Sequence, residues 1–222
     1  MKISLLHPSR NRAVKAHATF QNWLFNASGE NLYEYIISID NDDSQLSEYR
    51  RRFSGCTIIE NNNRSLVDAV NNAAKLATGD IIIVMSDDFD CVKDWDILLC
   101  EYIEANNLTG EYAIQVDDGY SFGKDGDDAN LLTIPIISIE LWLRLKYIYH
   151  PSYFSMFADN DIFEVCKTLN CLYIAPHIKF QHNHYTIGKS NKDDTYDRQN
   201  SMVAWTQGNA NLKQRKARNY DL

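Results

Sequence analysis

The chain has 222 residues, a formal net charge of −8, 45% hydrophobic residues and 12% aromatic residues. This length and composition allow one domain with a sizeable core and exclude a disordered chain. The acidic balance argues against broad attraction to nucleic acid or to an anionic membrane.

The first ninety residues alternate between strand and helix patterns. We predict strands over 2–6, 33–40, 56–60 and 80–86, and helices over 13–25, 44–53 and 65–77. This alternation is typical of a parallel sheet with helices on both faces. The predicted fold class is therefore α/β, with a mostly parallel central sheet in a single domain.

The second half of the chain is less regular. We expect a strand that leads into a turn over 111–120, a strand over 131–138 and one or two strands over 171–185. We expect helices over 94–105, 139–145 and from about Asp159, and a flexible loop over 123–128. Beyond Gly188 the chain becomes polar. We therefore divide it into a domain over 1–188 and an extension over 189–222, which is expected to be a mobile tail or a lid.

The extension carries a basic segment, "LKQRKAR", over 212–218. It places Lys213, Arg215, Lys216 and Arg218 close together. The favoured interpretation is a solvated tail, and the alternative is a patch that contacts phosphate.

Five cysteines are present, and no two of them form a CxxC pair. We expect them to be reduced. No stretch approaches the roughly 20 apolar residues of a membrane span, and the N-terminus lacks a secretory apolar region. We therefore expect a cytoplasmic protein without a membrane span.

Polar residues follow each of the first four predicted strands. They occupy 9–12, 40–43, 61–64 and 86–88. Ligands of parallel sheets bind beyond the carboxyl ends of the strands. All four groups are therefore expected to converge on one edge of the sheet.

Three acids, Asp87, Asp88 and Asp90, follow the apolar run 81–85. Clustered carboxylates are tolerated when a cation lies among them, and oxygen ligands suit Mg²⁺ or Mn²⁺. Alternatively, Asp88 or Asp90 caps the helix that follows.

Two further motifs carry groups that could take part in chemistry. In "FQHNH" (180–184), His182 and His184 share one face of a strand and could bind the same metal, although the favoured interpretation of the pair taken alone is two ordinary histidines. In "ADND" (158–161), Asp159 or Asp161 could be a general base at a helix start, or could simply cap that helix.

Arg10 and Arg12 follow the first strand and could pair with phosphate. They could equally form salt bridges with the acids at 40–43. Neither a Walker A sequence nor GxGxxG is present, so a glycine-rich phosphate loop is not supported.

Several motifs together resemble family 2-type glycosyltransferases with the GT-A fold, which is Rossmann-like. They are "ISLLHPSRNR", "IISIDND", "IIENNNRSLVDAVNNAAKLATGDIIIVMSDDFD", "LTIPIIS" and "FADNDIF", in that order, and the resemblance covers about 2–188. It implies a nucleotide-sugar donor held through Mn²⁺ or Mg²⁺. The residues that would contact the nucleotide are Pro8, Ser9, Arg12, Asp40, Asn63 and Arg64.

The resemblance also assigns the acids and histidines. Asp87 and Asp88 match the family's acidic motif, with Asp88 as the direct metal ligand and Asp90 as a second register. His182 or His184 matches a histidine that completes the metal shell. Asp159 matches the catalytic base; because Ala158 replaces the common preceding acid, Asp161 remains an alternative.

The function implied is an inverting, metal-dependent transfer of a sugar from a nucleotide diphosphate, expected to be UDP, to a hydroxyl acceptor, expected to be a glycan. A nucleic-acid acceptor is disfavoured by the charge of −8. The alternatives are a sugar-phosphate nucleotidyltransferase and a non-catalytic module that binds nucleotide sugars.

Overall fold

The computed structural model describes residues 1–124, 130–189 and 191–222. Most of the loop predicted over 123–128 lies outside these ranges. The elements of the first half are β1 (Lys2–Pro8), α1 (Ala13–Asn26), β2 (Leu32–Asp40), α2 (Leu46–Arg52), β3 (Thr57–Asn61), α3 (Leu66–Ala74), β4 (Ile81–Val84), β5 (Phe89–Cys91) and α4 (Trp95–Ala105). They confirm the predicted alternation of strands and helices.

The second half holds shorter strands than the sequence suggests. Its elements are β6 (Ala113–Asp117), β7 (Ile136–Ser138), α5 (Ile139–Leu145), α6 (Ala158–Thr168), β8 (Leu172–His182), α7 (Asp194–Gln199) and α8 (Met202–Ala217). The strand predicted over 131–138 forms only at its end, because Leu132 N–H donates to the Asp159 carbonyl instead of to the sheet. The segment 111–120 is a strand that leads into a turn, as predicted: β6 ends at Asp117, and the Asp118 carboxylate accepts backbone N–H groups of the turn.

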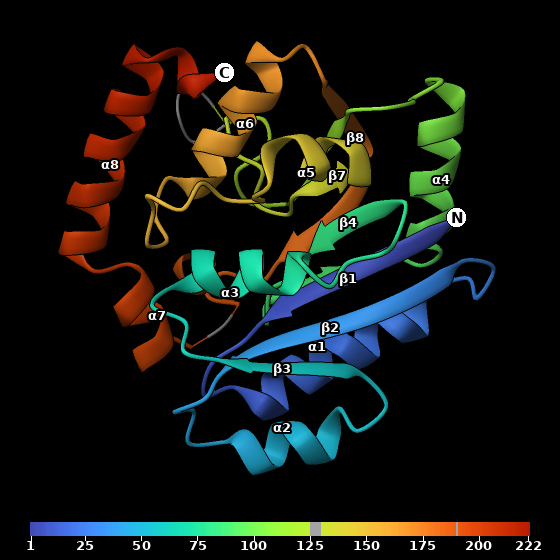
Figure 1. Ribbon diagram of the computed structural model, residues 1–222. Coiled ribbons are helices and arrows are strands. Elements are labelled where there is room, and N and C mark those ends of the chain that lie inside the picture. The colour runs from blue at the N-terminus through green and yellow to red at the C-terminus, as the bar shows by residue number, and fades with distance from the viewer. Residues whose placement is uncertain (125–129, 190) are drawn as a thin grey trace.

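Within the described residues, eight strands form one sheet in the order β3-β2-β1-β4-β7-β6-β8-β5. The pairs β1–β2, β1–β4, β2–β3 and β6–β8 are parallel, and β7 and β5 pair antiparallel with their neighbours. The fold class is therefore α/β with a mostly parallel sheet, as predicted. Helices α1 and α2 lie on one side of the sheet and α3 on the other (Figure 1).

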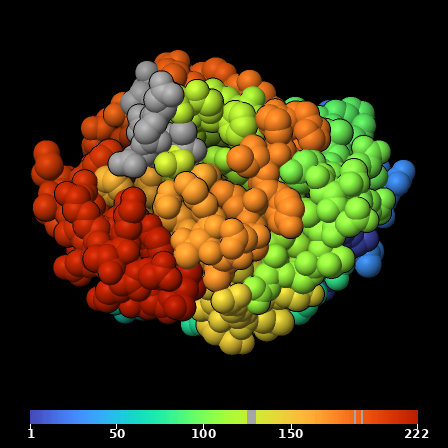
Figure 2. All heavy atoms as spheres, turned by 90° about the horizontal axis from the view of Figure 1, so that it is seen from above, coloured from blue at the N-terminus to red at the C-terminus, as the bar shows by residue number. Residues whose placement is uncertain are grey.

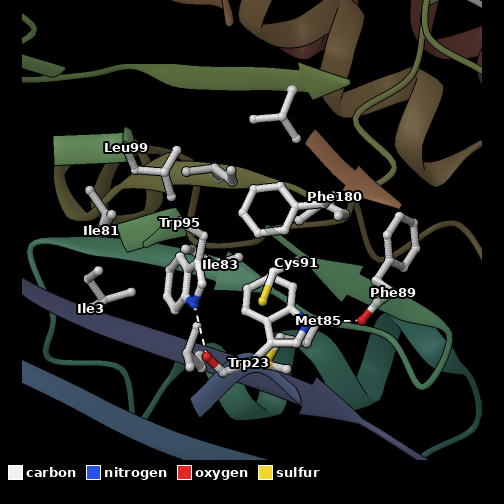
Figure 3. Packing of buried hydrophobic residues seen from close by; sticks show 14 of the residues in the cluster. Ile3, Trp23, Ile81, Ile83, Met85, Phe89, Cys91, Trp95, Leu99 and Phe180 are labelled. Carbon is white, nitrogen blue, oxygen red and sulfur yellow. Dashed lines mark hydrogen bonds between the residues drawn. The ribbon is translucent and has the colours of Figure 1, made fainter. Parts of the chain in front are cut away.

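The core on the α1 side joins the two halves of the chain. Trp23 stacks on Phe180 with ring centroids 4.9 Å apart. Its indole N–H donates to the Phe89 carbonyl at 2.9 Å, and the Trp95 indole donates to the Trp23 carbonyl at 3.0 Å (Figure 3). These contacts fix β5, and therefore the acidic segment before it, against β8.

All five cysteines are free, which confirms the expectation of reduced thiols. In the described ranges, none of the helices combines the length and apolar character needed to cross a bilayer.

Residues 194–217 form two helices, α7 and α8, which lie side by side with the rest of the domain (Figure 1). The Arg215 side chain is 2% exposed, and its Nε donates to Asp161 Oδ1 at 2.6 Å. The Tyr153 hydroxyl donates to the same oxygen at 2.9 Å. The interpretation of a solvated or phosphate-binding segment is therefore wrong for Arg215, although Lys213, Lys216 and Arg218 are exposed. The Asp161 carboxylate on α6 therefore determines which basic side chain of this segment is buried.

Arg215→Ala is expected to destabilise the fold by about 3–5 kcal/mol, because it leaves the Asp161 carboxylate buried without its cation. Lys216→Ala, on the exposed face of the same helix, should change stability by less than about 0.5 kcal/mol. Urea unfolding monitored by circular dichroism measures both variants. Equal stability of the two would contradict a structural role for the pair.

Candidate active site

A cavity of about 620 Å³ lies beyond the carboxyl ends of the central strands. Eleven of the residues singled out from the sequence line it: Pro8, Ser9, Arg10, Arg12, Asp40, Asp87, Asp88, Asp159, His182, His184 and Ser86. The predicted convergence at one sheet edge is thus found for three of the four polar groups. The fourth group reaches this edge through Asn63, whose Nδ2 donates to Asp40 Oδ1 at 2.9 Å.

Arg64, Asp90 and Asp161 do not line the cavity. The Arg64 side chain is 76% exposed and pairs with Asp68 at 2.6 Å. Asp90 lies on β5, where its carboxylate accepts from Asn183 Nδ2 at 2.7 Å. Asp90 therefore does not cap α4, which begins after Asp94.

Asp87 is buried, and it joins the ends of β1 and β4. Its Oδ1 lies 2.9 Å from His7 Nε2 and accepts from Ser9 Oγ at 2.9 Å. Arg12 Nη1 lies 3.4 Å from the other oxygen. His7, which the sequence analysis did not single out, thus supports the site through Asp87. Its place at the carboxyl end of β1 was the available signal. This network holds Asp87 in place and leaves Asp88 as the acid beside the histidines.

Asp88 and His182 lie together at the cavity wall. Asp88 Oδ2 is 3.5 Å from His182 Nε2, and Ser86 Oγ donates to Asp88 Oδ1 at 2.7 Å. Although burial alone would raise it, the hydrogen bond to His182 and its charge hold the pKa of Asp88 well below its usual range. The His184 ring centroid is 4.9 Å from that of His182. Burial, with His182 beside it, lowers the pKa of His184.

The donor set around Asp88 fits a divalent cation that also binds phosphate. His182 Nδ1 is buried and has no hydrogen-bond partner among the described residues. Within the described ranges, no cluster of three or more acidic, histidine or cysteine side chains could by itself enclose a metal. Mg²⁺-type ions commonly take one or two protein ligands and complete their shell with water and substrate phosphate. Asp88 and His182 would supply such a partial shell.

Asp159 lies in the first turn of α6, on the wall of the same cavity. Burial raises the pKa of this carboxyl to about 6. Its Oδ1 accepts the Asn160 N–H at 3.0 Å, so it also stabilises the helix start. Asp161, two residues on, is held by Arg215. Of the two acids, only Asp159 is placed to contact a ligand in the cavity.

The two arginines of the β1–α1 loop are already paired. Arg10 forms ion pairs with Asp40 and Asp42, as one of the two interpretations predicted. Arg12 instead pairs with Asp193, the N-cap of α7, through Nε at 2.7 Å. Asp193 had no local signal, because its partner lies at the other end of the chain. The pair fastens α7 to the β1–α1 loop.

The model of the family described as glycosyl transferase family 2 matches residues 6–162, which is more than half of the chain. The chain belongs to this family. Membership confirms the resemblance drawn from the motifs. A search of the curated proteins found no match.

Solved structures with the same fold include TarS and a mannosyltransferase. TarS 1–349 of S. aureus in complex with UDP has a TM-score of 0.61 and 14% identity, over 81% of this chain and 59% of that one. The mannosyltransferase PcManGT of Pyrobaculum calidifontis, in complex with GDP-Man and Mn²⁺, has a TM-score of 0.61 and 13% identity. That match covers 97% of this chain and 75% of PcManGT. The chain thus spans about three fifths of TarS 1–349. At these identities the likeness supports the GT-A fold.

The raised pKa of Asp159 predicts a pH-dependent stability difference. Because native Asp159 keeps its proton up to pH of about 6, native stability falls as the pH rises from about 4 to about 6. Asp159→Asn cannot ionise, so it should be more stable than wild type by about 3 kcal/mol above that range. Below pH of about 4 the difference should vanish. Urea unfolding across pH tests this.

Glu101→Gln, an exposed variant on α4, is the control and should not show this dependence. A gap between Asp159→Asn and wild type that stays constant from acid to neutral pH would contradict a raised pKa.

Proposed function

We propose that the chain is a metal-dependent, inverting glycosyltransferase that moves a sugar from a nucleotide-diphosphate donor, UDP-linked, to a hydroxyl of a glycan. The proposal rests on one observation about Asp159. Its carboxyl has a pKa of about 6, and its side chain lines the same cavity as Asp88 and His182. TarS is described with UDP and UDP-GlcNAc, and PcManGT with GDP-Man and Mn²⁺. These ligands support the donor class. A cytoplasmic location stays a prediction.

The donor nucleotide would lie over the ends of β1 and β2. Pro8, Ser9 and Arg12 line this part of the cavity, together with Asp40 and Arg10. Asn63 orients Asp40 through its 2.9 Å hydrogen bond. Since Arg10 and Arg12 are already neutralised by acids, donor binding would exchange these partners for phosphate oxygens. Arg64 would act only if it left Asp68.

The diphosphate would lie beside Asp88. Asp88 and His182 would hold Mn²⁺ or Mg²⁺, with His184 as the neighbouring candidate ligand. Such an ion, when bound, offsets the negative charge that develops on the leaving diphosphate. Asp90 is outside the cavity and would not take part. Asp87 would hold the loop that carries the nucleotide contacts in place.

The acceptor hydroxyl would lie against Asp159. An ionised carboxylate with a pKa of about 6 can accept a proton near neutral pH, which suits a general base. The base would act on the face of the sugar opposite the diphosphate, so one displacement would invert the anomeric carbon. Asp161 is unsuited to this role, since Arg215 and Tyr153 already occupy its Oδ1.

Wild type with Mn²⁺ is expected to release UDP slowly from at least one donor in a panel of UDP-sugars. Asp159→Asn should lower sugar transfer to an acceptor glycan by at least about 100-fold, because it removes the base, while UDP affinity stays nearly unchanged. Coupled UDP release and calorimetric titration with UDP measure these effects. Normal turnover by Asp159→Asn would contradict the role of the base.

The same assay separates the other functions. Consumption of a nucleoside triphosphate with a sugar phosphate would instead identify a nucleotidyltransferase. Mn²⁺-dependent UDP binding without any donor turnover would identify a binding module.

Asp88→Asn should abolish the Mn²⁺-dependent part of UDP binding, because the direct carboxylate ligand is lost. Asp90→Asn is the matched control: the acid is two residues away but faces solvent and Asn183. Calorimetric titration with UDP, with and without Mn²⁺, compares the two variants. Equal loss in both, or loss in Asp90→Asn alone, would overturn the assignment of Asp88.

A further inference from the structure

Trp205, on α8, is 47% exposed, whereas Trp23 and Trp95 are almost fully buried. It lines the main cavity and also a neighbouring shallow depression, which is bounded by Thr206, Asn209, Ala210 and Lys213. Asn209 is likewise shared by both. The cavity that holds Asp159 therefore continues outward along α8. A large aromatic ring left open at such a place is typical of a binding surface.

Helix α8 holds this ring at a fixed position relative to the catalytic helix. Trp205 packs edge-on against Phe157, with centroids 5.1 Å apart and planes at 87°. Phe157 is the N-cap of α6 and stands two residues before Asp159. A Cβ at Gly208 would overlap the Met156 carbonyl, so a glycine lets α8 approach this turn closely. The surface around Trp205 is thus built onto the same turn as the proposed base.

The Arg215–Asp161 pair fastens the other end of α8 to α6. Figure 2 shows the red C-terminal helices as one flank of the molecule, beside the orange part of the chain that contains α6. Attachment at both ends makes α8 a fixed wall of the site.

The side chains on this wall match the chemistry of a sugar ring. The indole presents a flat apolar face, and Thr206 and Asn209 add hydroxyl and amide groups that can both donate and accept. A pyranose has one face of C–H groups and a rim of hydroxyls. We propose that Trp205, Asn209 and Thr206 form the acceptor subsite, in which a sugar ring of the acceptor glycan stacks on Trp205 and directs its hydroxyl toward Asp159. This inference rests on the proposed function.

A lipid surface is the competing occupant, because Met202 and Val203 are also exposed in the first turn of α8. Thr206 and Asn209 line the depression, and the net charge of −8 opposes an anionic bilayer. The chemistry of the wall therefore favours a polyhydroxyl ligand.

The test uses the full chain with Mn²⁺ and UDP. The probes are chitotetraose, cellotetraose, mannotetraose and maltotetraose. At least one should bind wild type and protect the exposed tryptophan from iodide quenching. Trp205→Ala should weaken this binding about 10-fold, while Trp205→Phe, which keeps an aromatic face, should lose less. Met202→Ala, on the same helix but outside the cavity lining, should bind like wild type.

UDP affinity should stay unchanged in all three variants, and Met202→Ala should also release UDP from donor alone at the wild-type rate. Failure of wild type to bind UDP or turn over donor would count against the proposed function, whichever tetrasaccharides bind. Binding of no tetrasaccharide, or equal binding by wild type and Trp205→Ala, would overturn the acceptor subsite. Protection of Trp205 by phosphatidylglycerol vesicles and by none of the sugars would overturn it in favour of a membrane contact.

Discussion

The buried carboxylate of Asp87 is the constraint on which the site depends. It is 4% exposed, and a polar group so far from water must find partners inside the protein. His7, Ser9 and Arg12 provide them. Because these residues lie at or just after the end of β1 while Asp87 follows β4, their bonds fix the ends of two adjacent strands to each other. The floor of the cavity is therefore held by electrostatics as well as by the sheet.

The three clustered acids then divide into different roles. The carboxylate of Asp87 is occupied by hydrogen bonds inside the protein. Asp90 faces solvent on β5. Asp88 remains between them, next to His182 and at the cavity. Antiparallel pairing of β5 with β8 produces this separation, since Phe89 lies opposite His182 in the register. The strand pair therefore brings the histidine to the acid, although 93 residues separate them in the sequence.

The sequence predicted the first half of the fold well, because its signals are local. Apolar runs such as 81–84, buried on both faces, and the small-residue face of α3 each report their own environment. Parallel strands also end at one edge by geometry, so the convergence around Asp88 followed from the order of elements. The family resemblance added the assignment of Asp159. The strand at 131–138 was overestimated, because only the fold shows that Leu132 bonds to α6.

The C-terminal part was harder to predict because its decisive contact joins residues that are far apart in the sequence. A run of basic residues is normally solvated, and nothing in "LKQRKAR" separates Arg215 from its neighbours. Only the packing of α8 on α6 turns Arg215 inward, where Asp161 compensates its charge. The same pair occupies Asp161 and leaves Asp159 as the acid that lines the cavity. A stabilising contact in the extension thus decides which of the two candidate acids is left facing the cavity.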